Sequence, residues 1–234
     1  YVDLKPKVTD VRVFCGDSAA APNGSPTTCI TGQPGTGIHP GGWGTILIGG
    51  MRYGGSCGAC SSGSNNGGPA MSVTADFGSG TQTTRTFYSS YFVLDITDPE
   101  QDPVLLWTFT DATLGLGTSF PSIARVSPVA DGKTDNTNAA WYAVFGSGPT
   151  GYTGSSAQVA KFFVVDIARG PSYDSDKTSD TVGQTSCSPS TPCVVVNTAS
   201  SPVRVRAFST GDSNSFMGDI ITLDANQDYR VDVI

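Results

Sequence analysis

The strongest chemical signal in the sequence is a run of oxygen-bearing side chains near its end, DANQDYRVD over residues 224–232. Carboxylate and amide oxygens at the first, third, fifth and ninth positions of a loop, with a backbone carbonyl at the seventh, form a donor set that wraps a hard cation. Ca²⁺ suits such donors better than Mg²⁺, because it accepts many flexible oxygen ligands. The spacing therefore predicts a calcium site whose ligands are Asp224, Asn226, Asp228, Arg230 (through its carbonyl) and Asp232.

Two features of this loop depart from the calcium-binding loop of the EF-hand. Tyr229 stands at the sixth position, where the EF-hand has a glycine for a sharp turn. The twelfth position, which carries a bidentate glutamate in the EF-hand, falls beyond Ile234. The alternative interpretation is an Asp/Asn-rich turn between two strands with no ion bound.

The cysteines fall into three local groups, each in a segment rich in Gly, Ser, Pro and Thr. Six cysteines allow fifteen connectivities, so spacing alone does not fix the pairing. We favour pairing within each group, and disulfides in such loops indicate an oxidising, extracytoplasmic compartment. The three groups are Cys15 with Cys29, Cys57 with Cys60, and Cys187 with Cys193.

The sequence Cys57-Gly58-Ala59-Cys60 has the spacing of redox and metal motifs. A haem attachment site needs a histidine next, where Ser61 stands, and a zinc site needs more ligands than the single histidine of the chain, His39, can add. No βαβ pattern surrounds the motif. We therefore interpret it as a disulfide within a glycine-rich loop.

Signals for catalysis are weak throughout the chain, and we predict no catalytic residues. Gly146-Ser147-Gly148 lacks the spacing of a nucleophile elbow, and His39 lies in a Gly/Pro loop without an evident partner. Asp95 and Asp166 occupy matching places in a repeat, which favours a role in turns over a catalytic pair. The tryptophans on predicted strands are typical of a core: Trp43, Trp107 and Trp141.

Composition limits the class of protein that these residues belong to. Of the 234 residues, 38% are hydrophobic and 14% charged, and 29 are glycine and 15 proline, which argues against disorder and against helical bundles. Nineteen of the 20 acidic residues are Asp, which favours turns, and Glu100 is the only glutamate. A net charge of −7 argues against nucleic acid and anionic membranes as partners, and no apolar run is long enough to span a membrane.

Short β-branched and aromatic runs separated by turn residues predict an all-β protein. The chain opens at Tyr1 without an initiator Met and stops at Ile234 within an alternating run, so we expect a piece of a longer or processed protein. The expected strands come in three sets: 8–14, 43–49, 90–96 and 104–110; then 119–126, 141–146, 160–167 and 193–198; then 216–223 and 229–234.

The sets resemble one another. Residues 43–50 (WGTILIGG) match 141–148 (WYAVFGSG), and residues 91–96 (YFVLDI) match 162–167 (FFVVDI). Four strands per repeat, with the third ending in Asp-Ile, are typical of β-propeller blades, whereas a β-sandwich gives no reason for the paired motifs. We predict a modified β-propeller of four-stranded antiparallel blades, with residues 1–234 forming part of one domain.

The expected repeats span about 8–110, 119–198 and an incomplete 216–234, and the cysteine-containing insertions lie at 51–89 and 170–192. A propeller ring needs roughly four to eight blades. The remaining blades of the same protein are therefore expected partners of this chain. The insertion 51–89 is either a contact surface or a loop held by a disulfide.

Taken with the loop at 224–232, these motifs resemble the PilY family of type IV pilus tip-associated proteins. The resemblance implies a modified β-propeller at the C-terminal end of a large secreted protein, exported through the periplasm to the pilus tip at the cell surface. It implies roles in pilus assembly, extension and retraction control, and adhesion, with pilus subunits (minor pilins) and a host or surface receptor as partners. It also implies that Ca²⁺ occupies the loop, bound by Asp224, Asn226, Asp228, Arg230 and Asp232.

Two alternatives belong to other classes. A quinone-dependent dehydrogenase propeller has similar blades, but it needs a cofactor-stacking tryptophan and cation ligands on the central axis, which nothing in this sequence identifies. A structural subunit of an extracellular filament is the other alternative, because an unpaired strand at 229–234 would invite a partner chain.

Overall fold

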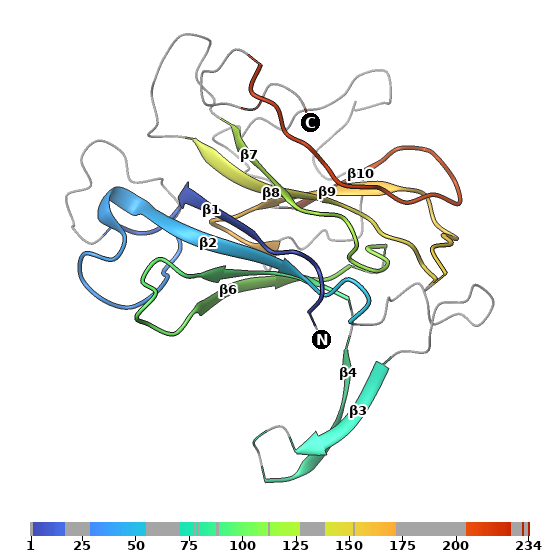
Figure 1. Ribbon diagram of the computed structural model, residues 1–234, viewed down its shortest axis with the longest axis horizontal. Coiled ribbons are helices and arrows are strands. Elements are labelled where there is room, and N and C mark those ends of the chain that lie inside the picture. Colours follow the sequence, from blue (N-terminus) through green and yellow to red (C-terminus); the bar gives the residue numbers. More distant parts are fainter. Residues whose placement is uncertain are drawn as a thin grey trace.

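The computed structural model describes residues 2–16, 29–54, 71–76, 78, 80–87, 89–111, 113–126, 139–151, 153–171, 205–225, 231 and 234. This part of the chain is all-β, with two four-stranded antiparallel sheets and a separate two-stranded hairpin (Figure 1). One short 3-10 turn, Pro40–Gly42, precedes the second strand. Among the described residues no helix has the length and apolar character needed to cross a membrane.

The first sheet, which we call sheet 1, consists of four strands that follow one another along the chain except for an inserted hairpin. Its spatial order is β1 (Lys7–Arg12), β2 (Trp43–Gly50), β5 (Tyr91–Asp95) and β6 (Val104–Phe109). Alternate residues of β5 are buried, as the two-residue period of a strand requires, although its first four residues are all apolar. The hairpin of β3 (Met71–Asp76) and β4 (Gln82–Phe87) leaves the sheet between β2 and β5.

The second sheet, sheet 2, repeats this arrangement. Its strands are β7 (Ser122–Val126), β8 (Ala140–Gly146), β9 (Lys161–Asp166) and β10 (Val205–Ser209), each paired with the next. The strand β8 is nearly continuously apolar and its residues from Tyr142 onward are buried, so it is covered on both faces.

Several predicted elements differ from the observed ones. The predicted strand at 193–198 lies outside the described residues, and the fourth strand of sheet 2 is β10. The predicted strand at 216–223 is wrong, because this stretch is held by side-chain hydrogen bonds and has no ladder partner beyond a bridge residue at Leu223. The insertion at 51–89, expected to be a loop, contains the β3–β4 hairpin.

The two matched segment pairs occupy equivalent strands, second and third, of the two sheets, but one match is offset. Gly50 pairs with Tyr91 in sheet 1, and Gly146 pairs with Phe162 in sheet 2. The ladder therefore makes Gly50 equivalent to Gly146, two residues away from the partner that the sequence match gave. Because side chains alternate with a period of two, this shift leaves every residue on its predicted face.

The main core lies between the two sheets. Tyr91 stacks on Phe145 with ring centroids 4.0 Å apart, and Phe109 lies 5.2 Å from Phe145 and 5.1 Å from Phe163. The indole nitrogen of Trp107 donates a hydrogen bond to the carbonyl of Ile167. Aromatic packing and one directed hydrogen bond thus fix how sheet 1 sits on sheet 2.

The sheets stack front to back. We define the front face of sheet 1 by Ile46, Ile48, Tyr91 and Val93, and the front face of sheet 2 by the equivalent Tyr142, Val144, Phe162 and Val164. The front of sheet 1 packs against the back of sheet 2, which carries Ala143, Phe145, Phe163 and Val165. The front of sheet 2 belongs to a second core cluster on its other side. Equivalent residues therefore point in the same direction, whereas in a two-fold sandwich both sets would point inward.

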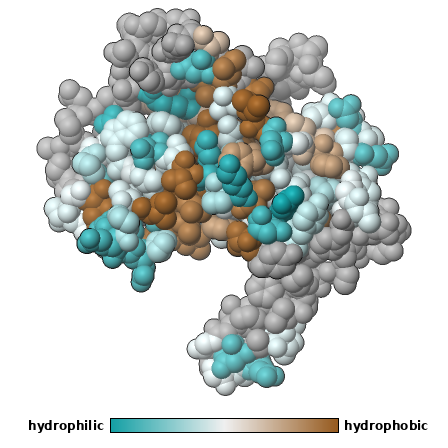
Figure 2. Space-filling view, viewed as in Figure 1, coloured by the Kyte–Doolittle hydropathy of each residue, from teal (hydrophilic) through white to brown (hydrophobic). Residues whose placement is uncertain are grey.

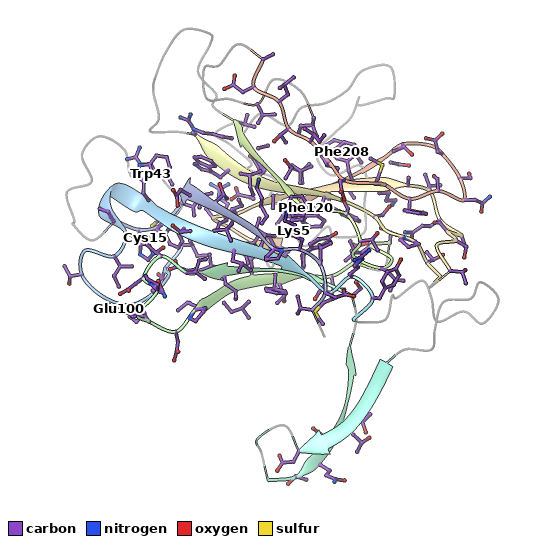
Figure 3. The ribbon with its side chains drawn as sticks, viewed as in Figure 1. Lys5, Cys15, Trp43, Glu100, Phe120 and Phe208 are labelled. Carbon is purple, nitrogen blue, oxygen red and sulfur yellow. A yellow bond between two sulfur atoms is a disulfide. The ribbon has the colours of Figure 1, made fainter. Side chains whose placement is uncertain are left out.

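The stretch 218–225 lies alongside β7 and covers the front of sheet 2. Ile220 belongs to the second core cluster, and the hydroxyl of Thr222 donates to the carbonyl of Ile123 at 2.9 Å. The carboxylate of Asp219 accepts a hydrogen bond from the amide of Phe120, which Figure 3 labels between the two sheets. Both faces of sheet 2 are thus covered.

Phe145 tests the junction between the sheets, because three aromatic rings surround it. We expect Phe145→Ala to lower the free energy of unfolding by about 3–5 kcal/mol, since the truncated side chain leaves a cavity between two β-layers. The matched control is Phe216→Ala, at a ring 42% exposed, where a change below about 1 kcal/mol is expected. Urea unfolding measures both, and equal losses would contradict the proposed core.

Candidate functional site

The predicted calcium ligands lie mostly outside the described residues. Asp224 is described and half-buried, at the end of the stretch that follows β7. Asn226, Asp228, Arg230 and Asp232 fall outside the described part of the chain. In that described part, no three His, Cys, Asp or Glu side chains gather as a metal-binding group.

The structure does describe residues on either side of 226–230. The hydroxyl of Thr222 donates to the carbonyl of Ile123, and the amide of Val231 donates to the carbonyl of Arg125 at 3.0 Å. Ile123 and Arg125 are two residues apart on β7, a separation of about 7 Å along a strand. Thr222 and Val231, described residues on either side of 226–230, therefore both lie beside β7.

A second cluster, formed by His39 and Asp95, is fully described. The Nε2 atom of His39 lies 2.9 Å from the Oδ2 atom of Asp95, and the two residues are 3% and 0% exposed. The imidazole ring stacks on Phe14 with centroids 4.0 Å apart. The expectation that His39 has no evident partner is therefore wrong, because the fold brings Asp95 from 56 positions away.

Backbone and hydroxyl groups satisfy the rest of the Asp95 carboxylate. The amide of Gln33 donates to Oδ2 at 2.6 Å, and the amide and hydroxyl of Thr97 both donate to Oδ1. Gly32 lies so close that a Cβ atom there would stand 2.0 Å from Oδ2 and 2.9 Å from the His39 ring. Only glycine fits at this position, so the segment before His39 is shaped around the carboxylate.

The side chain of Gln33 extends this network to the turn after β5. Its Nε2 atom donates to the carbonyls of Asp98 and Asp102, and its Oε1 atom accepts from the amide of Asp98. The Cys15–Cys29 disulfide lies beside the cluster, since the backbone of Cys15 and Ile30 joins through a hydrogen bond next to Phe14. Figure 3 labels Cys15 and Glu100 at this end of sheet 1. The segment 29–42 is thus tied to the end of β5 by both covalent and polar links.

The disulfide confirms the predicted pairing for one of the three cysteine groups. Cys57, Cys60, Cys187 and Cys193 lie outside the described residues. A disulfide is consistent with an oxidising compartment.

Asp95 and Asp166 end equivalent strands and both accept hydrogen bonds from the turns that follow. Asp166 accepts from the amide of Arg169 at 3.1 Å, as Asp95 does from Thr97. The two carboxylates thus act in turns, the role that the repeat indicates. Asp95 differs in also binding the histidine.

Three groups of the described chain have clearly shifted pKa values. Burial raises the pKa of Tyr91 well above its usual range, and burial, with a smaller contribution from Asp166, raises that of Tyr142 to about 12. A hydrogen bond from the amide of Glu100, and then one from Gln101, lowers the pKa of Asp98. Each of these shifts moves the group away from neutral pH, so none of them provides acid–base catalysis there.

The contact between His39 and Asp95 has a structural role. A general base must reach a substrate, and both side chains are buried within the end of sheet 1. Sequence reasoning missed this pair because one histidine in a Gly/Pro loop carries no spacing signal. The only available hint was the Asp-Ile ending shared by the repeats.

Comparison of the chain with protein-family models, with curated proteins and with solved structures found no match.

Asp95 is expected to contribute strongly to stability. Asp95→Ala leaves His39 and the amides of Gln33 and Thr97 buried without their acceptor, and we expect a loss of about 3–5 kcal/mol in the free energy of unfolding. The control is Asp10→Ala, at an exposed carboxylate that accepts one bond from the hydroxyl of Thr45, with an expected loss below about 1 kcal/mol. Thermal unfolding with circular dichroism compares them, and similar losses would refute a special role for Asp95.

Proposed function

We propose that this chain is part of a calcium-binding, non-enzymatic β-propeller of a type IV pilus tip protein, acting in pilus assembly, extension and retraction control, and adhesion. The single observation that supports it most is the front-to-back stacking of two equivalent four-stranded sheets. Blades of a propeller are related by rotation about a common axis, so each front face meets the back of a neighbour. The partners in this proposal are further blades of the same protein, minor pilins and a surface receptor.

The path of the chain after sheet 2 supports the same proposal. Hydrogen bonds join Ser119 to Gly218, Ser122 to Thr222 and Arg125 to Val231. Both partners advance along the chain together, so the last stretch runs parallel to β7. First strands of neighbouring blades run parallel around a propeller axis. This is the path that the first strand of a third blade would take.

The back face of sheet 1 supports further blades. Its ladders align one apolar row across all four strands: Val8, Leu47, Leu94 and Leu105. Val8 and Leu105 are 51% and 56% exposed. The equivalent row of sheet 2 includes Ala143 and Val165, which are fully buried under sheet 1. The exposed row therefore has the composition of a face that another blade covers.

This row gives a test of the proposed fold. We expect Leu105→Asp to change the unfolding free energy of the 234-residue chain by less than about 0.5 kcal/mol, because the side chain is already exposed. In a longer polypeptide that carries the neighbouring blades, the same change should cost about 2 kcal/mol or more, since it buries an unpaired charge. Thr153→Asp, at an exposed loop residue, is the control for both lengths. Equal effects of Leu105→Asp in the two proteins would argue against a covering blade.

Calcium binding is supported by the donor set of the sequence, and the hydrogen bonds of Thr222 and Val231 to β7 hold residues on both sides of 226–230 near one strand. The loop residues offer carboxylate, amide and carbonyl oxygens, which are hard donors. The Cys15–Cys29 disulfide is consistent with an extracellular location.

Calorimetry tests the calcium site directly. We expect Ca²⁺ to bind the chain and Asp228→Ala to weaken binding by roughly tenfold or more, because one charged ligand is lost. Asp212→Ala removes an exposed carboxylate outside the loop and should leave binding unchanged. Absence of Ca²⁺ binding to the unmodified chain would exclude the metal site. In piliated cells, Asp228→Ala should alter surface piliation and twitching motility, and unchanged pili would count against the proposed role.

A further inference from the structure

The β3–β4 hairpin, residues 71–87, forms an arm that projects away from both sheets (Figure 1). Its six ladder pairs run from Met71 with Phe87 to Asp76 with Gln82. At the tip, the Asp76 carboxylate accepts hydrogen bonds from the amides of Gly78 and Gly80, and both glycines have positive φ. The arm is therefore a formed ribbon with a fixed turn.

The arm has two open backbone edges among the described residues. The other eight strands belong to four-stranded sheets, whereas β3 and β4 pair only with each other. In a ribbon of two strands, alternate backbone N–H and C=O groups of each strand point outward. A two-stranded hairpin alone is marginally stable in water, and three or more strands are the usual minimum.

The arm has few of the features that normally protect a free edge, and Arg85 is the one charged residue of β4. Lysine, proline and inward-pointing charges are the common protective features, and residues 71–87 contain no lysine and no proline. Figure 2 shows the arm standing clear of the body, with its coloured surface hydrophilic to neutral. Exposed side chains are Thr74, Asp76, Thr81, Gln82, Thr83 and Thr84. Threonine favours strands, so these residues suit an extended sheet.

We propose that the arm is a dimerisation element, in which the open β4 edge of one arm pairs with the β4 edge of a second copy of this chain. The pairing joins two ribbons into one four-stranded sheet across a two-fold axis. Two-fold interfaces of this kind use the same surface patch on both subunits. Each arm thereby gains the strands that it lacks.

Two observations favour a second copy over a foreign peptide. Domains that capture peptides at a sheet edge take specificity from side-chain pockets beside that edge, and the arm stands away from the body that would supply them (Figure 2). Charge also fits self-pairing. The chain carries a net charge of −7, but the arm has one acidic residue, Asp76, and one basic residue, Arg85. Neutral arms can meet while the acidic bodies stay apart.

A charge-swap experiment tests this proposal. The side chain of Thr84 is exposed and contacts Thr74 across the ribbon at 2.8 Å. We expect the unmodified chain to dimerise in analytical ultracentrifugation. Thr84→Lys and Thr84→Glu should each weaken the dimer by about tenfold or more, because like charges meet near the two-fold axis. An equal mixture of the two variants should restore it, since opposite charges then face each other.

Matched controls keep the result interpretable. Thr153→Lys and Thr153→Glu change an exposed threonine away from the arm and should dimerise like the unmodified chain. Near-ultraviolet circular dichroism reports whether each variant keeps the packed core, and a chain with residues 71–87 replaced by a Gly-Ser linker should be monomeric. A chain that is monomeric at millimolar concentration, a dimer unaffected by the Thr84 variants, or an arm that captures only an unrelated protein would each overturn the proposal.

Discussion

Sheet 2 has two apolar faces, and this constraint organises the molecule. Ala143 and Phe145 point to one side of β8, while Tyr142 and Val144 point to the other, and all four are buried. A strand of this kind cannot have one side in water, because each exposed face would give up the burial of several large side chains. Sheet 1 covers one side and the stretch containing Ile220 covers the other. Sheet 2 thus has a packed neighbour on each of its two faces.

Local patterns predicted most strands because their signal is contained in a few adjacent residues. β5 and β9 each contain four consecutive apolar residues before a final Asp, and both form where expected. The β3–β4 hairpin carries a weaker signal, since its threonines and glycines also suit a loop. The stretch 216–223, by contrast, is predicted to be a strand and does not form one. Its two adjacent isoleucines differ in exposure, with Ile220 buried and Ile221 exposed, but a strand also needs a ladder partner, which a local pattern cannot supply.

In the candidate sites too, features within one sequence segment could be predicted, whereas contacts between distant segments could not. Cysteines 14 positions apart in a turn-rich segment could be paired from the sequence. The oxygen donors at 224–232 also form a local pattern, and the calcium site that they indicate stays a prediction. The contact between His39 and Asp95 could not, since it depends on how the segment after Cys29 folds against β5. The hydrogen bonds of Thr222 to Ile123 and of Val231 to Arg125 likewise depend on the tertiary structure.

All three tryptophans lie at the junction of the two sheets. Trp43 of sheet 1 meets Trp141 of sheet 2 edge to face, with centroids 6.0 Å apart, and Trp107 bonds across to Ile167. Tryptophan fluorescence therefore reports on the interface between sheet 1 and sheet 2. A change in this fluorescence reports the separation or sliding of the two layers, and unfolding confined to peripheral loops leaves that signal unchanged.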